Sequence, residues 1–137
     1  MAGNTEMKYR CALLLGLTGR LSAQADTVLC NITYGGETRQ IEAAPVASPY
    51  TVAPTKIGSF FLFRIVFQDQ PADLASIKLY TYADRDSGPS IIHQASYPYP
   101  LPPAAVDSFT GRQFVYEPMR DGELQYLCRM KTGSTAK

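Results

Sequence analysis

Two of the three cysteines in this chain lie far apart in the sequence, and each falls on the apolar side of a segment with strand-like alternation. Cys30 belongs to such a segment near the N-terminus and Cys128 to one near the C-terminus. Both side chains would point into a core, where they can be joined if their strands are adjacent or lie in facing layers. We favour a disulfide between Cys30 and Cys128, and two buried free thiols are the alternative.

The N-terminal segment has the three parts of a secretory signal. Lys8 and Arg10 give a basic start, Cys11–Leu17 is apolar, and Ala23-Gln24-Ala25 offers small residues at a cleavage site. We therefore interpret residues 1–25 as a signal peptide or disordered segment and predict an exported protein of the periplasm, the cell envelope or the extracellular space. An amphipathic N-terminal arm is the alternative. The apolar run is shorter than the about 20 residues that cross a bilayer, so no transmembrane anchor is expected in the mature chain.

Residues 26–131 are predicted to form one domain, followed by a disordered tail at residues 132–137. Hydrophobic residues make up 45% of the chain, which is enough for a folded core.

The net charge is only +1, and no dense basic patch is present. Because nucleic-acid-binding proteins carry such a patch, nucleic acid is not expected as a partner.

Apolar and polar residues alternate with a period of two along most of the domain, and Gly, Pro and Asp interrupt the alternation at short intervals. This pattern predicts an all-β fold, either an antiparallel β-sandwich or a partly open barrel of about seven strands. Phe60–Gln68 is apolar on both faces and must therefore be central in its sheet. The predicted strands are Thr27–Tyr34, Glu37–Ala43, Phe60–Gln68, Ser76–Ala83, Ile91–Tyr97, Gln113–Glu117 and Glu123–Met130.

Residue patterns that support catalysis are missing from the sequence. His93 is the single histidine, which excludes a site with two histidine ligands in one chain, and no nucleophile motif accompanies it. Asp84–Gly88 has acidic residues at alternate positions, as a calcium loop does, but its glycine comes one place early and the distal glutamate is absent. We interpret it as an acidic turn that ends the strand before it. The sequence thus predicts a protein that is not an enzyme and that has no metal and no cofactor.

Two segments carry the candidate binding residues, which are Tyr80, Tyr82, Tyr97, Tyr99 and Arg64. Tyr97–Pro103 alternates with prolines and is expected to be extended, either as a rigid crossover between two sheets, which we favour, or as a surface for a partner. If Phe60–Gln68 pairs with Ser76–Ala83, one sheet face carries Arg64 beside Tyr80 and Tyr82, a set suited to gripping a protein or stacking on a sugar. Cover by other strands or by the proline segment is the favoured alternative for that face.

Phe109–Pro118, followed by Glu123–Cys128, resembles the C-terminal part of small exported proteins of Gram-negative bacteria. The similarity extends back through Ala95–Pro103 and the Phe60 strand. The resemblance implies a location outside the inner membrane and accessibility to a host immune system as an antigen. It implies no catalytic residues.

The sequence thus favours an exported, noncatalytic β-domain that binds a protein or an envelope glycan. An inhibitor or accessory subunit of an extracytoplasmic enzyme is the alternative, with Asp84–Ser90 or Tyr97–Pro103 as the inserted element.

Overall fold

The computed structural model describes residues 24–103, 105 and 107–133, together with Gly3, Gly16, Gly19 and Arg20. Most of the predicted signal segment, including Cys11, and residues 134–137 of the predicted tail lie outside the described residues.

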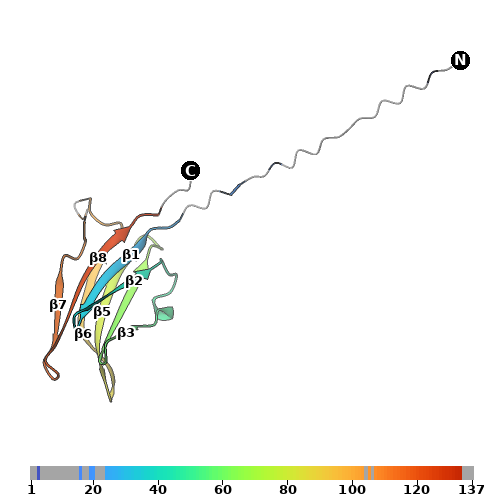
Figure 1. Ribbon diagram of the computed structural model, residues 1–137. Coiled ribbons are helices and arrows are strands. Elements are labelled where there is room, and N and C mark those ends of the chain that lie inside the picture. Colours follow the sequence, from blue (N-terminus) through green and yellow to red (C-terminus); the bar gives the residue numbers. More distant parts are fainter. Residues whose placement is uncertain are drawn as a thin grey trace.

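Two antiparallel four-stranded sheets pack face to face (Figure 1). The first has the strand order β2-β1-β8-β7 and the second the order β3-β4-β5-β6. The first sheet comprises β1 (Thr27–Tyr34), β2 (Glu37–Ala43), β7 (Gln113–Glu117) and β8 (Gly122–Lys131), and the second comprises β3 (Thr55–Ile57), β4 (Phe61–Gln68), β5 (Ser76–Arg85) and β6 (Gly88–Pro98). A 3-10 turn, η1 (Pro49–Thr51), lies between β2 and β3. This confirms the predicted β-sandwich; the additional strand, β3, is too short for its periodicity to be recognised.

The core fills the space between the sheets, and β4 contributes most of its aromatic rings. Phe61, Phe63, Ile65 and Phe67 are all buried, as the alternation requires. Strand β4 pairs with β3 on one side and with β5 on the other, so its predicted central position is confirmed. Alternation within the predicted strand Phe60–Gln68 would place Phe60 on the face opposite to Phe61. This is wrong for Phe60, because it precedes the strand and its ring is buried beside that of Phe61, with 4.8 Å between centroids.

Strands β5 and β6 are longer than predicted because the acidic turn takes part in their pairing. Asp84 lies opposite Pro89 and Arg85 opposite Gly88, so only Asp86 and Ser87 form the hairpin turn. Gly88 has φ +109°, which allows the chain to reverse in so few residues.

The pairing of β5 with β6 shifts by one residue at a β-bulge. Thr81 lies opposite His93 and Tyr82 opposite Ile91, which leaves Ile92 as the extra residue. Bulges redirect the side chains that follow them. As a result Ile92 and His93 are both half-buried although they are adjacent in sequence, which simple alternation does not allow.

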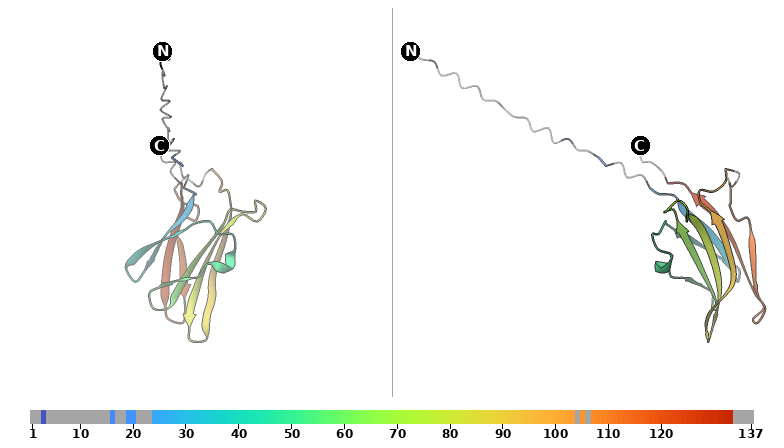
Figure 2. Two further views of the ribbon diagram at one scale, coloured as in Figure 1. Left: turned by 90° about the vertical axis from the view of Figure 1, so that its right-hand side faces the viewer. Right: turned by 180° about the vertical axis from the view of Figure 1, so that it is seen from behind.

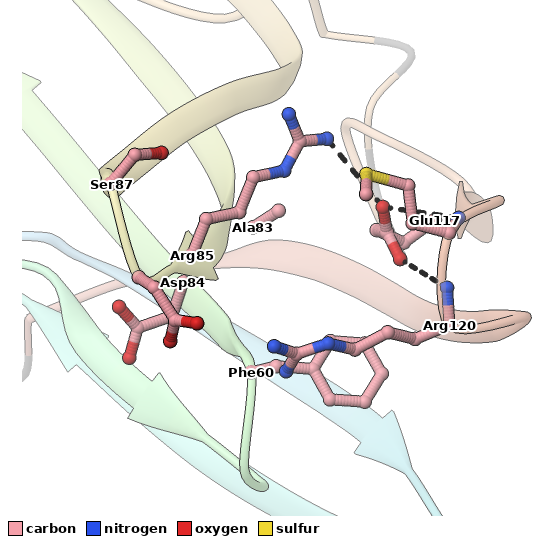
Figure 3. Close-up of a pocket in the computed structure, with 9 residues that line it drawn as sticks. Phe60, Ala83, Asp84, Arg85, Ser87, Glu117 and Arg120 are labelled. Atoms are coloured by element: carbon pink, nitrogen blue, oxygen red, sulfur yellow. Dashed lines mark hydrogen bonds and ion pairs between the residues drawn. The ribbon is translucent and has the colours of Figure 1, made fainter.

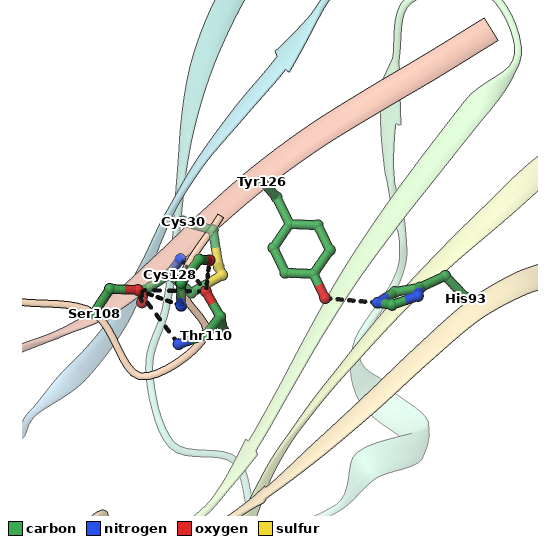
Figure 4. The surroundings of a disulfide bond; sticks show 7 residues. Cys30, His93, Ser108, Thr110, Tyr126 and Cys128 are labelled. Atoms are coloured by element: carbon green, nitrogen blue, oxygen red, sulfur yellow. Dashed lines mark hydrogen bonds between the residues drawn. A yellow bond between two sulfur atoms is a disulfide. The ribbon is translucent and has the colours of Figure 1, made fainter. Parts of the chain in front are cut away.

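The disulfide between Cys30 and Cys128 is present and joins β1 to β8 within one sheet (Figure 4). The backbone N–H of Cys128 donates to the Thr110 hydroxyl at 2.9 Å, and its carbonyl oxygen accepts from the Ser108 hydroxyl at 2.7 Å. These groups point away from β1, so the two cysteines form a non-hydrogen-bonded pair. Opposing side chains are closest at such pairs, which explains why a disulfide fits at this position.

Candidate functional site

The structure brings three of the predicted binding residues together on the outer face of the second sheet. Arg64 lies directly opposite Tyr80 in the pairing of β4 with β5, and its guanidinium carbon is 5.3 Å from the centre of the Tyr80 ring. Tyr82, two residues along β5, stacks on Tyr80 with 6.3 Å between centroids. Ile91 lies opposite Tyr82 and is 56% exposed. We call Tyr80, Tyr82 and Ile91 the tyrosine face.

Arg64 also holds the connection between β2 and β3 against the sheet. Its Nε donates to the carbonyl oxygen of Val52 at 2.8 Å, and its Nη2 donates to that of Pro49. The same connection bonds to β4 through the Val46 amide and the Phe67 carbonyl, at 2.8 Å. This connection is thus held against β4, and cover of the tyrosine face is only partial, because Tyr80 and Tyr82 are half-buried. The guanidinium is fixed by two backbone partners, so the stack that it begins is preorganised.

Tyr97 and Tyr99 are not part of the tyrosine face. Tyr97 lies opposite the buried Ile77, on the inner face of β6, and packs edge-on against Phe109 with 5.0 Å between centroids. Tyr99 packs in the same manner against Phe67, at 4.7 Å. Burial raises the pKa of both phenols. These rings anchor the start of the crossover from the second sheet to the first, which is the structural role that the sequence favoured for the proline segment.

His93 lies between the sheets and bonds to the opposite layer. Its Nε2 is 2.7 Å from the hydroxyl of Tyr126, a residue of β8 (Figure 4). Burial raises the pKa of the Tyr126 phenol and lowers that of His93. The lowered pKa favours a neutral His93 imidazole, and the raised pKa favours a protonated Tyr126 phenol. The phenol can then donate a hydrogen bond to the imidazole. This arrangement stabilises the packing of the two sheets and needs no substrate.

We expect the stability of the protein to fall as the pH drops from about 6.5, the ordinary pKa of histidine. Since the folded state holds the pKa of His93 below that value, the unfolded chain binds the proton more readily, and protonation favours unfolding. The loss continues until the pH passes below the folded pKa. Urea unfolding between pH 7.5 and 5.5 would show this slope in the native protein and a shallower one in His93→Gln. Equal slopes in the two proteins would contradict the assignment.

The β5–β6 and β7–β8 hairpins lie at the same end of the sandwich (Figure 2). A pocket of about 320 Å³ opens between residues of these two hairpins (Figure 3). Its apolar wall includes Phe60, Ala83 and Met119, and two arginines line its rim. The Arg120 guanidinium lies over the Phe60 ring, with 4.9 Å from the guanidinium carbon to the ring centre. An apolar wall beside fixed guanidinium groups suits one side chain of a protein partner.

Glu117 is the most buried charged residue beside this pocket, with 2% of its side chain exposed. Its two carboxylate oxygens accept from the backbone N–H groups of Met119, at 3.3 Å, and Arg120, at 2.8 Å. Arg85 approaches the same carboxylate from the other hairpin, at 3.5 Å (Figure 3). Because these groups already engage both oxygens, Glu117 joins two hairpins and is not a free base.

Sequence reasoning missed this pocket because its residues come from three separate segments of the chain, namely Phe60, residues 83–87 and residues 117–120. Strand alternation placed the Phe60 side chain on the face opposite to Phe61. It gave no indication that Glu117 or Arg120 would contribute to a pocket. The burial of Glu117 follows from the strand phase shared with Val115, which was the one available signal.

Among the residues that the structure describes, no group of three or more His, Cys, Asp and Glu side chains could hold a metal ion. No helix in the same part of the chain is long and apolar enough to cross a membrane. Comparison of the chain with protein-family models, curated proteins and solved structures found no match.

Proposed function

We propose that this chain is an exported, noncatalytic binding module whose tyrosine face docks on a protein partner. The observation that carries the proposal is the preorganised stack of Arg64, Tyr80 and Tyr82, with Ile91 exposed at its end. Tyrosine and arginine dominate the energetics of protein interfaces, and rings already held in place lose little entropy on binding.

Export is supported by the disulfide, which is characteristic of oxidising compartments, and by the resemblance of Phe109–Pro118 to small exported proteins of Gram-negative bacteria. A binding module rather than an enzyme is supported by the engagement of His93 and Glu117 in internal hydrogen bonds. These are the residues from which general acid or base chemistry would most readily be built.

Site-specific photocrosslinking in the native host tests the proposal. A photoreactive amino acid in place of Ile91 should give an adduct with one protein. The same group in place of Leu74, which is also exposed but lies in the turn between β4 and β5, should not. Tyr82→Ala should lower the yield from position 91 by about tenfold, as for an interface residue worth about 1.4 kcal/mol. Identical adducts from positions 91 and 74 would refute the protein-docking role. An adduct yield from position 91 that is unchanged by Tyr82→Ala would refute it as well.

The alternative, an inhibitor or accessory subunit, draws support from the β5–β6 hairpin. This hairpin reaches the end of the sandwich (Figure 2), and its turn residues Asp86 and Ser87 line the pocket. A photoreactive group at Ser87 would then capture an enzyme, and the purified chain would change the activity of that enzyme. An adduct from position 91 alone favours the tyrosine face instead.

A further inference from the structure

The outer face of the first sheet carries a row of side chains that crosses all four strands. Thr38 on β2 lies opposite Thr33 on β1, which lies opposite Gln125 on β8, which lies opposite Phe114 on β7. Because directly opposed residues point to the same side of a sheet, the four side chains form one line. We call Thr38, Thr33, Gln125 and Phe114 the outer row.

A second line lies beside the outer row, two residues along each strand. Asn31 on β1 lies between Gln40 and Leu127, its partners on β2 and β8. Arg112, two residues before Phe114, completes the line at the β7 edge. A groove of about 470 Å³ runs over this part of the sheet, and Asn31, Thr33, Thr38, Arg112, Gln125 and Leu127 all line it.

The chemistry of the groove matches that of a sugar chain. Hydroxyl and amide groups both donate and accept hydrogen bonds, as the hydroxyl groups of a sugar do, and the Arg112 guanidinium adds a planar array of donors. Phe114 is 57% exposed and closes the outer row with a ring on which the apolar face of a sugar can stack. Within the described residues, the groove lining carries a single charge, that of Arg112.

The length of the outer row sets the size of the ligand. Neighbouring strands are about 4.8 Å apart, so four strands span about 14 Å. That distance exceeds one sugar ring and requires an extended chain of several units. A single line of neutral polar groups with an aromatic ring at its end also differs from the tyrosine face, where stacked rings and an arginine suit a protein.

We infer that the outer face of the β2-β1-β8-β7 sheet is a glycan-binding site that takes an extended oligosaccharide along the outer row. Phe114 stacks on a sugar ring at the β7 edge. The hydroxyls of Thr33 and Thr38 bond to each other at 2.8 Å, and the Gln125 amide donates to Glu123 at 3.3 Å. Each of these groups keeps a further donor or acceptor, which bonds to a hydroxyl group of the sugar chain. Arg112 lies where it can pair with the carboxylate of an acidic sugar. The site is on the sheet opposite the tyrosine face, so it does not depend on the protein-docking role.

An array of neutral and acidic oligosaccharides tests the inference, with titration of the strongest ligand against the full chain. Phe114→Ala and Gln125→Ala should each weaken binding about tenfold or more, because each removes one contact in the middle or at the end of the row. Tyr50→Ala, which removes an aromatic ring that is 91% exposed in η1, is the matched control and should leave the dissociation constant unchanged. Arg112→Ala should weaken binding of acidic chains more than that of neutral ones.

Phe114 and Gln125 lie on the outer face of the first sheet, and Tyr50 is exposed. The unfolding curves of these three variants should therefore coincide with that of the native protein. Lack of binding to every oligosaccharide at millimolar concentration would overturn the inference. Binding that survives both Phe114→Ala and Gln125→Ala, or that Tyr50→Ala abolishes, would overturn it as well. None of these outcomes alters the crosslinks expected from position 91, which test the protein-docking role separately.

Discussion

Reduction of the Cys30–Cys128 disulfide is expected to lower the free energy of unfolding by about 4 to 5 kcal/mol. The bond closes a loop with a sequence separation of 98 residues, and the chain-entropy model gives a large effect for a loop of this length. A domain of this size has a total stability on the order of 5 to 15 kcal/mol, so the reduced protein should be close to unfolding. Urea unfolding with and without reductant measures the difference.

The effect arises in the unfolded state, which supplies a second readout. A reduced chain expands further on unfolding and exposes more surface, so the urea m-value should rise when the bond is broken. The Cys30→Ala/Cys128→Ala double variant should resemble the reduced protein. Alkylation of both Cys30 and Cys128 without reductant would contradict the prediction. A urea unfolding midpoint that is the same with and without reductant would contradict it as well.

Glu117→Ala should destabilise the protein by about 2 to 3 kcal/mol. The substitution leaves the turn amides of Met119 and Arg120 without their acceptor, and it leaves the Arg85 guanidinium without its carboxylate. These donors bond to a carboxylate that is itself buried, so removal of the acceptor leaves several part-buried donors unpaired, and each adds to the cost. Thermal or urea unfolding of the variant measures the change.

Glu117→Gln is the matched control because it keeps the shape of the side chain and one acceptor oxygen. Glu117→Gln should lower the free energy of unfolding, but by less than Glu117→Ala does. If Glu117→Ala unfolded within about 0.5 kcal/mol of the native protein, the carboxylate would not be what joins the β5–β6 and β7–β8 hairpins.

Strand positions were largely predictable from the sequence because one face of each strand is buried. Thr27–Tyr34, Glu37–Ala43 and Gln113–Glu117 agree with the structure at both ends. Errors occurred where another interaction overrides alternation. Phe60 turns inward beside Phe61, and the acidic residues after Ala83 continue the pairing with β6 instead of ending the strand.

The candidate binding surfaces were predictable only within single strands. Arg64, Tyr80 and Tyr82 were correctly placed on one face because they belong to two strands that are consecutive in the sequence. The outer row could not be predicted from the sequence because its residues come from four strands. In addition, polar residues on the solvent-facing side of a strand are common in any β-sandwich.

The sequence by itself determined the all-β class, the inward phase of Cys30 and Cys128 and the central position of β4, because all three follow from the two-residue repeat of a strand and the burial of its apolar side. Only the tertiary structure decided which strands are neighbours. Pairing β1 with β8 brought the cysteines together, the bulge in β6 turned His93 toward Tyr126, and the meeting of two hairpins buried Glu117. Such contacts depend on strand order and register, which local periodicity does not encode.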